Sequence, residues 1–487
     1  MNAGLTDQVA LLLSRAQRTI TEPAARATLA LAAQRLAEPL RVAIAGKVKA
    51  GKSTLLNAMV GEELAPTDAG ECTRIVTWYQ DGPRYRATAH LPDGQAEQRP
   101  FDRADGAVRI ALGRPADEID HLTVEVPSRR LRQHTLIDTP GLASLSADVS
   151  LRTMSFLEAD AERAAETDAV VYLLRHMHSS DLRFLEAFHG DDLVYGTPVN
   201  AVGVLSRADE IGACRLDAME AAGRVASRYQ GDERLRRLCP VVVPVAGLLA
   251  SGAATLREGE YATLARIAAA PERDAVDLLL TADRFTATGG PAGQVERRRA
   301  LDRMGLFGVR MSVRLIRDGA VSSATDLSRE LTARSGLDRL RDTLTAQFVG
   351  RSQVLKARSA LAALDTVLRG RAGDRAAYEL AVAAEQIRAS AHEFVEVRLL
   401  HLLRSGRLPG RDDQHAEMAR LLGGDGTSPA QRLGLPADAQ PWQLAAEAER
   451  SLRRWQQVAE HPLTGRELGT AARAVARTCE GLLSTLP

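Results

Sequence analysis

Residues 41–58 read RVAIAGKVKAGKSTLLNA, and this stretch decides the fold. Its first five residues are a short apolar run, which predicts a buried strand, and the residues after Ser53 have a helical pattern. Between them, residues 46–53 fit G-x-x-x-x-G-K-[ST], a phosphate-binding loop that needs a strand before it and a helix after it. Because motif and context agree, we expect such a loop. The alternative is a glycine loop that only turns the chain.

The chemistry of the loop follows from its residue types. Backbone N–H groups in such a loop surround phosphate oxygens, and the N-terminus of the following helix adds its dipole. Lys52 is expected to place its ammonium on the β and γ phosphate oxygens, and Ser53 to offer its hydroxyl to Mg²⁺. The predicted nucleotide-binding residues here are Gly46, Lys47, Val48, Lys49, Ala50, Gly51, Lys52, Ser53 and Thr54.

A second motif, Asp138-Thr139-Pro140-Gly141, directly follows an apolar run at residues 135–137. An aspartate at a strand end can hold Mg²⁺ through water, and a glycine amide at this point can contact the γ-phosphate and tie a switch loop to it. We therefore expect Asp138 at the metal and Gly141 in a catalytic role. The alternative is a plain turn.

A switch loop also needs a hydroxyl that reaches Mg²⁺ when the γ-phosphate is present. Thr73 stands twenty positions after Ser53 in a polar, glycine-containing segment, and we assign it that catalytic and metal-binding role. Thr67 and Thr77 are alternatives, as is a turn without function. The predicted metal set is therefore Ser53, Thr73 and Asp138.

Base selection is expected at the end of a later strand, where Ser206, Arg207 and Asp209 follow an apolar run at residues 199–205. A carboxylate accepts hydrogen bonds from N1–H and the amino group of guanine and repels the ring acceptor of adenine. Asp209 therefore favours GTP, although the usual motif has lysine where Arg207 stands. An exposed acid at a strand end is the alternative. Ala246 and Gly247, after the next strand, are expected to contact the base through their backbone.

These motifs resemble those of bacterial dynamin-like GTPases. The resemblance rests on GKVKAGKST, PTDAGECTRIVTWY, DTPG, SRADEIG, PVAGLLA and RSGLDRLRDTL, and it runs from about residue 36 to 350 and more weakly beyond. It implies a GTPase domain on a helical stalk that N- and C-terminal helices build together, self-association through GTPase domains, and work at membranes. The residues that carry over are Lys52, Ser53, Thr73, Asp138, Gly141, Arg207 and Asp209.

The predicted fold class is an α/β P-loop GTPase domain, with a mostly parallel sheet and helices on both faces, plus an all-α helical stalk bundle. Apolar runs alternate with helical stretches up to about residue 245, which favours a parallel sheet. Beyond residue 350 the pattern predicts helices at 352–369, 376–403, 412–422 and 442–486. The expected domains are N-terminal stalk helices at 1–39, a GTPase domain at 40–350 with a helical insertion at about 255–335, and a stalk at 351–487 with a tip loop at about 405–440.

Two departures from the family pattern bear on catalysis. Val48 stands where dynamins have a glutamine that orients water, and Leu142 follows the Asp138 motif, where Ras-type proteins have theirs. Lys49 occupies the position of a serine that holds a monovalent cation in dynamins and of an arginine finger in guanylate-binding proteins. Since three of only four lysines lie at positions 47, 49 and 52, we assign Lys49 a catalytic role. A solvated lysine that only aids binding is the alternative.

The net charge of +1 in 487 residues excludes a strongly basic surface, and we expect no nucleic-acid partner. Four widely separated cysteines indicate neither a zinc site nor a disulfide framework. The N-terminus has no secretory pattern and no apolar run is long enough to span a bilayer, so we expect a cytoplasmic protein. The resemblance implies peripheral contact at the inner face of the plasma membrane. The expected membrane surface is the stalk tip, with Arg404, Arg407, Arg411, Leu408, Leu421 and Leu422, and a solvated hairpin is its alternative.

We therefore expect a dynamin-like GTPase that hydrolyses GTP to GDP and phosphate with Mg²⁺ and couples this to self-association and membrane remodelling or maintenance. Two alternatives share the same motifs. One is a regulatory or assembly GTPase without a membrane role. The near-neutral C-terminal region argues against it, because such a GTPase is expected to carry a basic RNA-binding domain. The other is a scaffold that binds GTP and hydrolyses it slowly, which the absent glutamines favour.

Overall fold

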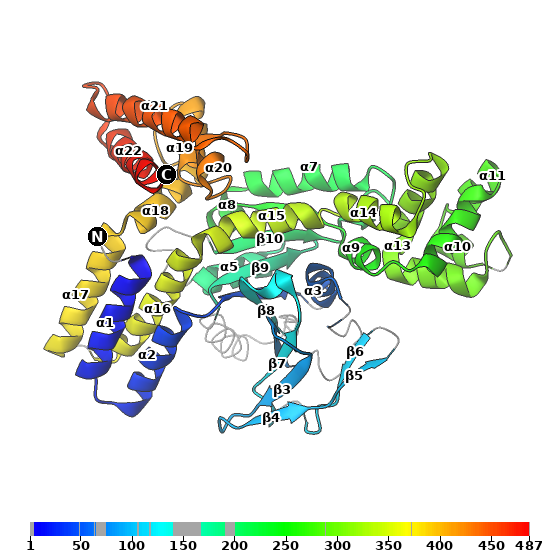
Figure 1. Cartoon of the computed structure of the whole chain (residues 1–487), viewed down its shortest axis with the longest axis horizontal. Coiled ribbons are helices and arrows are strands. Elements are labelled where there is room, and N and C mark those ends of the chain that lie inside the picture. Colours follow the sequence, from blue (N-terminus) through cyan, green and yellow to red (C-terminus); the bar gives the residue numbers. More distant parts are fainter. Residues whose placement is uncertain are drawn as a thin grey trace.

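The computed structural model describes residues 4–47, 49–62, 64, 75–104, 107–115, 118–139, 167–189, 200–287, 289–371 and 373–486. Figure 1 shows a central β-sheet with helices around it, a group of helices that extends from one end, and two further helical groups at the other end. The N- and C-terminal parts of the chain both lie in these two groups.

In the described part of the chain, nine strands form one sheet in the order β11-β10-β9-β1-β8-β2-β7-β3-β4. Strand β1 (Leu40–Gly46) is parallel to both of its neighbours, β8 and β9, and β9, β10 and β11 continue this parallel half. The other half is mixed, because β2 is antiparallel to β8, and β3 is antiparallel to β7 and β4. The remaining bounds are β2 Val76–Asp81, β3 Arg86–His90, β4 Ala96–Arg99, β7 His121–Val126, β8 His134–Asp138, β9 Ala169–Leu174, β10 Ala201–Ser206 and β11 Val242–Val245, with a separate hairpin of β5 Phe101–Ala104 and β6 Ala107–Ile110.

Helices cover both faces of the parallel half of the sheet. Side chains alternate between the two faces of a strand, so Val42 and Ile44 of β1 pack with Leu55 on one face, while Ala43 and Ala45 pack against the other. The first face is covered by α3 (Lys52–Val60), α9 (Gly247–Ala254) and α15 (Leu337–Gln347), and the second by α5 (Ser179–His189), α7 (Ala218–Gly231) and α8 (Glu233–Leu238). The predicted α/β class with helices on both faces is therefore confirmed.

The helical insertion after β11 and α9 has an apolar core of its own, which includes Phe285, Met304 and Phe307. Figure 1 shows it extending away from the sheet beside α9. Its helices are α10 Glu258–Ala269, α11 Glu272–Leu278, α12 Ala282–Thr286, α13 Gln294–Arg317 and α14 Ala324–Arg334.

N-terminal and C-terminal segments form one helical bundle. Its members are α1 Leu5–Thr19, α2 Pro23–Arg35, α16 Ser352–Arg369 and α17 Arg375–Ser390. Helix α1 packs against α16 and α17 and α2 packs against α16, because the buried residues of each helix recur at intervals of three or four positions. A polar contact adds to this packing where the chain leaves α2. There Lys356 Nζ donates to the carbonyl oxygens of Leu36 at 2.7 Å and Glu38 at 3.1 Å, which ties α16 to the end of α2.

The remaining helices form a second group, which we call the C-terminal helical lobe. It comprises α18 His392–Arg404, α19 Asp412–Leu421, α20 Pro429–Leu433, α21 Pro441–Glu460 and α22 Arg466–Thr485. The expected single helices at 376–403 and 442–486 are wrong, since Ala391 is extended and a turn at 461–465 separates α21 from α22. The break at Ala391 separates α17 in the bundle from α18 in the lobe, and the turn at 461–465 lets α22 pack back against α21 in the core around Trp455. Periodicity within one segment does not reveal such breaks.

The segment 405–440 does not present the apolar surface that we expected for membrane contact. Leu408, Leu421 and Leu422 are buried in the core of the lobe. The turn after α19 packs on the junction between α15 and α16, which contains the short helix η5 (Val349–Arg351). There Arg351 Nη2 donates to the Gly423 carbonyl at 2.6 Å, and Gln347 Nε2 donates to the Gly424 carbonyl at 2.9 Å. A loop that projects into solvent and a loop that packs against the protein can have the same turn-rich composition. The sequence therefore did not distinguish between them.

The domain boundaries given above stay a prediction. The structure adds one negative finding: among the described residues, no helix combines the length and the apolar character needed to cross a membrane.

We expect the shared bundle to contribute measurably to stability. Leu13 of α1 is fully buried, so Leu13→Ala should lower the free energy of unfolding by about 2–5 kcal/mol. Leu11, on the same helix, is 66% exposed, and Leu11→Ala should change it by no more than about 0.5 kcal/mol. Chemical denaturation of both variants measures this difference, and equal effects would contradict the packing of α1.

Candidate nucleotide-binding site

The phosphate-binding loop lies between β1 and α3, as its motif requires. Gly46 ends β1 with φ +147°, and a Cβ there would lie 2.9 Å from the carbonyl oxygen of Leu173 on β9. Gly51 has φ +96° and precedes the first turn of α3, and a Cβ built on it meets no atom within 4 Å. The first glycine therefore permits close strand packing, and the second opens space at the helix N-terminus, where a phosphate group would bind.

Lys52 points into this loop. Its Nζ donates to the carbonyl oxygens of Gly46 at 3.3 Å and Lys47 at 3.5 Å. Burial lowers the pKa of Lys52, and the nearby carboxylate of Asp138 partly offsets this. The ammonium is thus held within the loop at the position where it can contact phosphate oxygens.

Asp138 ends β8, directly beside the loop, because Ile44 of β1 is its register partner. Ser53 Oγ donates to Asp138 Oδ2 at 3.3 Å. The other oxygen, Oδ1, is buried and has no hydrogen-bond partner among the described residues. Burial raises the pKa of Asp138 to about 6, against the opposing effects of Lys52 and Ser53.

A hydroxyl and a carboxylate with one unpaired oxygen are oxygen ligands of the kind that Mg²⁺ prefers. Ser53 and Asp138 therefore fit the metal site that the sequence predicts. The third expected ligand, Thr73, lies outside the described residues, as do Thr67, Val48, Gly141 and Leu142. The alternative Thr77 is buried in β2, and its hydroxyl donates to the Ile75 carbonyl at 3.3 Å.

An aspartate that the sequence analysis missed anchors the loop from α5. Asp181 is almost completely buried and accepts from Lys47 Nζ at 3.3 Å, from the Tyr172 hydroxyl at 2.9 Å and from the His178 amide at 2.8 Å. This pair accounts for Lys47, one of the two lysines beyond the motif. Only the position of Asp181 near the start of a helix was visible in the sequence, and its partner was not.

The residues expected to read the base lie at the end of β10, on the same sheet edge. Asp209 lies in a short 3₁₀ helix, η4 (Ala208–Glu210), and is 6% exposed. Burial raises its pKa to about 6. Ser206 Oγ donates to the carbonyl oxygen of Leu174 on the neighbouring strand at 3.3 Å. The side chain of Ser206 therefore joins β10 to β9. Asp209 supplies the carboxylate that is expected to read the base.

Arg207 connects the base-reading segment to the phosphate-binding loop. It has a left-handed backbone, with φ 52°, and its Nη2 donates to the Lys49 carbonyl at 3.3 Å. Its Nη1 donates to Glu210 at 2.8 Å, and Glu210 also pairs with Arg175 at 2.9 Å. An arginine at this position thus spans the distance between the two motifs.

Ala246 and Gly247 follow β11, next to α3. The Ala246 amide donates to the Ser335 carbonyl at 2.9 Å, so this N–H is already used within the chain. A Cβ on Gly247 would lie 3.8 Å from Thr54 Cγ2, which places Gly247 against the first turn of α3. The structure thus brings these residues to the same edge as the other motifs.

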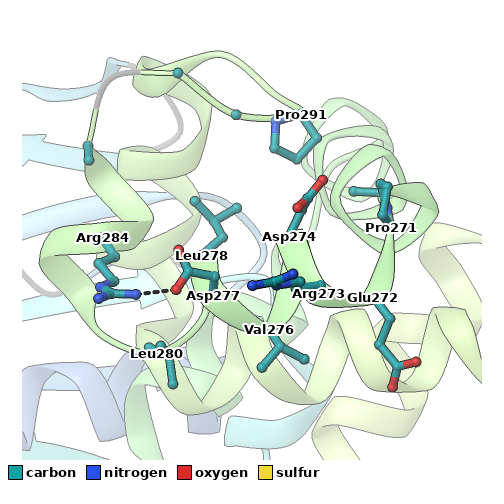
Figure 2. Close-up of a pocket in the computed structure, with 14 residues that line it drawn as sticks. Pro271, Glu272, Arg273, Asp274, Val276, Asp277, Leu278, Leu280, Arg284 and Pro291 are labelled. Atoms are coloured by element: carbon teal, nitrogen blue, oxygen red, sulfur yellow. Dashed lines mark hydrogen bonds and ion pairs between the residues drawn. The ribbon is translucent and has the colours of Figure 1, made fainter.

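A separate cleft of about 1360 Å³ lies in the helical insertion and contains none of the predicted site residues. Figure 2 shows it between α11 and the loop that follows α12, with Arg273 and Asp274 beside it and an ion pair between Arg284 and Asp277. Its charged groups are of both signs, and the phosphate-binding features described above belong to a different part of the fold.

Comparison with known proteins agrees with this geometry. The model of the "Dynamin family" matches residues 42–187. Over 459 residues, 92% of this chain and 91% of its relative, the chain is 42% identical to isoniazid-induced protein IniC of Mycobacterium tuberculosis. The chain belongs to the dynamin family. Within this dynamin family, it is also 31% identical over 121 residues to a bacterial dynamin-like protein of Nostoc punctiforme, which covers 22% of this chain and 17% of that protein.

Isoniazid-induced protein IniA of M. tuberculosis, a further relative, is 37% identical over 141 residues, or 27% of this chain and 22% of IniA. Among solved structures, an oligomerised bacterial dynamin pair described as sensing and tethering membranes is 13% identical, with a TM-score of 0.32, and the match covers 99% of this chain and 79% of that chain. Membership of the dynamin family rests on the sequence relatives.

We expect the affinity for Mg²⁺–GTP to depend on the ionisation of Asp138. Below about pH 6 its carboxyl group becomes protonated, so the gain in GTP affinity that Mg²⁺ provides should fall as the pH falls. The measurement is the ratio of two GTP affinities, one with Mg²⁺ and one with a chelator present, at several pH values between 5 and 8. The ratio is used because the ionisation of Asp209 affects both affinities equally. Asp138→Asn should make this ratio small and remove the part of its pH dependence that Asp138 causes, leaving that of the γ-phosphate. An unchanged ratio would contradict the metal role.

Proposed function

We propose that this chain binds GTP together with Mg²⁺ and hydrolyses it to GDP and phosphate. The observation that carries the proposal is the hydrogen bond from Arg207 to the Lys49 carbonyl. It joins the segment with the base-reading carboxylate to the loop with the phosphate-binding geometry, so that one nucleotide can contact both. Membership of the dynamin family supports the same reaction.

The residues of the chain divide the work of binding. The loop N–H groups and Lys52 contact the phosphates, and Asp209 accepts hydrogen bonds from the guanine edge. Ser53 and Asp138 would hold Mg²⁺, which would neutralise negative charge on the phosphate groups. Thr73 and Gly141 are proposed to close the switch loops on the γ-phosphate, as the sequence motifs suggest.

Lys49 is our candidate for the additional positive charge in the transition state. It is exposed, has a left-handed backbone with φ 62°, and has its carbonyl held by Arg207. Lys47 is paired with Asp181, so Lys49 is the loop lysine whose ammonium faces solvent. We propose that it contacts the oxygen between the β and γ phosphates when two GTPase domains meet and exclude water.

Self-association through GTPase domains and peripheral work at the inner face of the plasma membrane are further parts of the proposal, and family membership supports them. The buried leucines of the 405–440 segment do not provide the membrane surface. A slow, GTP-gated scaffold is the second candidate, because Val48 stands where dynamins have a glutamine that orients water and Leu142 stands where Ras-type proteins have theirs.

Two assays run together separate the candidates. GTP turnover is measured over a range of protein concentrations, and liposome co-sedimentation is measured with and without a non-hydrolysable GTP analogue. A dynamin-like enzyme should show turnover that rises with concentration and nucleotide-dependent binding to liposomes. Turnover without liposome binding indicates a regulatory GTPase, and tight GTP binding with slow turnover at all concentrations indicates the scaffold.

Asp209→Asn should change the base preference. The amide presents donors where the carboxylate presents acceptors, so GTP affinity should fall at least about tenfold and xanthosine triphosphate should become the preferred nucleotide. Competition binding measures both. Glu210→Gln removes a neighbouring charge and should keep the preference for GTP over xanthosine triphosphate. Unchanged GTP affinity in Asp209→Asn would contradict the guanine assignment.

Lys49→Ala should separate catalysis from binding. A contact made only in the transition state lowers kcat and leaves KM nearly unchanged, whereas a uniform binding contact raises KM. Arginine fingers contribute about 10³–10⁵-fold, and we expect a loss near the lower end because an ammonium is more strongly hydrated. Added K⁺ should partly restore the rate. Lys52→Ala, which should lose nucleotide binding, is the control, and normal kcat in Lys49→Ala would refute the role.

A further inference from the structure

Helix α13 of the helical insertion is interrupted in its middle. Gly305 has φ 67° and ψ 172°, a backbone conformation outside the helical region, between helical segments on both sides. Residues with a side chain rarely adopt this conformation. The break therefore depends on glycine at this position, and it kinks α13, which packs against α9.

The interruption lies against the carboxylate that we assign to the base. A Cβ built on Gly305 would be 3.5 Å from Asp209 Oδ2 and 3.6 Å from Leu248 Cδ2. Leu248 follows Gly247 at the start of α9 and is 37% exposed. The backbone of Gly305, the carboxylate of Asp209 and an exposed apolar side chain thus meet at one point.

Close packing fixes α13 in this position. A Cβ on Gly252 of α9 would be 2.5 Å from the Arg303 carbonyl oxygen, and one on Gly308 would be 2.9 Å from Leu249 Cδ1. Met304, next to the break, is fully buried. Because the two helices approach at backbone distance, the break has little freedom to move away from Asp209.

A single arginine also ties the turn after Asp209 to the helical insertion. Arg310 Nη1 donates to the carbonyl oxygens of Ala213 at 3.0 Å and Cys214 at 2.7 Å. Its Nε and Nη2 donate to the carbonyl oxygens of Leu279 at 2.9 Å and Leu280 at 2.8 Å. The base-reading segment and α13 therefore behave as one structural unit.

We propose that the break in α13 forms one wall of the base-binding site, and that Gly305 is a position that determines specificity for guanine. This inference rests on the proposed binding of GTP. A purine must bring its donors within hydrogen-bond distance of Asp209, and glycine leaves space beside Oδ2 for that approach. The apolar side chain of Leu248 offers a surface on which the flat ring can lie.

The test separates loss of this space from loss of helix geometry. Gly305→Ala adds a methyl group beside Asp209 and a strained backbone. Gly319→Ala, just after the C-terminus of α13, also places a side chain at a positive φ of 69°, but its Cβ would meet no atom within 4 Å. The affinities of both variants for GTP, ATP and inorganic tripolyphosphate are measured by competition, together with Tm.

In Gly305→Ala we expect GTP affinity to fall at least about tenfold, as for the loss of a hydrogen bond to a charged group, while affinity for tripolyphosphate stays within about twofold of wild type. Gly319→Ala should retain the wild-type ratio of the two. If Gly305→Ala has the wild-type ratio of GTP affinity to tripolyphosphate affinity, whether both are unchanged or both are lowered equally, the inference is overturned.

If Gly305→Ala does not fold, Leu248→Ala gives the second test, because this side chain is partly exposed. It should weaken GTP binding several-fold and leave tripolyphosphate binding unchanged. Unchanged GTP affinity would contradict the proposal that the base binds against this wall. Wild-type protein that binds ATP as tightly as GTP would instead refute the proposed function, and this inference with it. The two failures are therefore distinguishable.

Discussion

The parallel pairing of β1 with β8 and β9 is the constraint on which the candidate site depends. Carboxyl ends of parallel strands meet at one edge of a sheet, and loops at that edge converge. Gly46, Asp138 and Ser206 end the parallel strands β1, β8 and β10, so all three lie at the same edge of the sheet. Burial of β1 on both faces holds this register, since a shift by one residue would move Ala43 and Ile44 to the wrong faces.

Asp138, Asp181 and Asp209 are three carboxylates of the candidate site and its supporting shell, and each has a different environment. Asp181 accepts three hydrogen bonds, one of them from an ammonium, so its negative charge is well compensated. Asp138 and Asp209 are less well compensated, and burial raises the pKa of each to about 6. Burying a charge without enough partners costs free energy. The carboxylates of Asp138 and Asp209 lack sufficient partners within the chain, and a metal ion and a guanine base would supply them. This is consistent with the roles proposed for the two residues.

Arginine side chains join the helical parts to the GTPase domain by donating to backbone carbonyls. Arg310 does this in the helical insertion, and Arg351 of η5 does it by donating to the Gly423 carbonyl of the C-terminal helical lobe. Arg404 of the lobe donates to the Gly424 carbonyl within the lobe and to the side-chain oxygen of Gln347 on α15. Burial lowers the pKa of Arg351 to about 9 and that of Arg404 to about 10. A guanidinium has five donors in a fixed plane and can bond several carbonyl oxygens together. The strong preference of this chain for arginine over lysine thus has a structural use outside the loop, where lysine is concentrated.

The sequence by itself determined the strand–loop–helix at residues 41–58, the acidic residues at two later strand ends, and the strands of the parallel half. These are local patterns, because an apolar run and the loop that follows it lie within a few residues of each other. It did not reveal β3, β4 and β7, which lack a continuous apolar run, nor the breaks at Ala391 and at 461–465. Only the tertiary structure decided that Asp181 pairs with Lys47, that Gly305 lies against Asp209, and that the leucines of 405–440 are buried. Each of these depends on contacts between segments far apart in the chain, and such contacts leave no periodicity or spacing in the sequence around either partner.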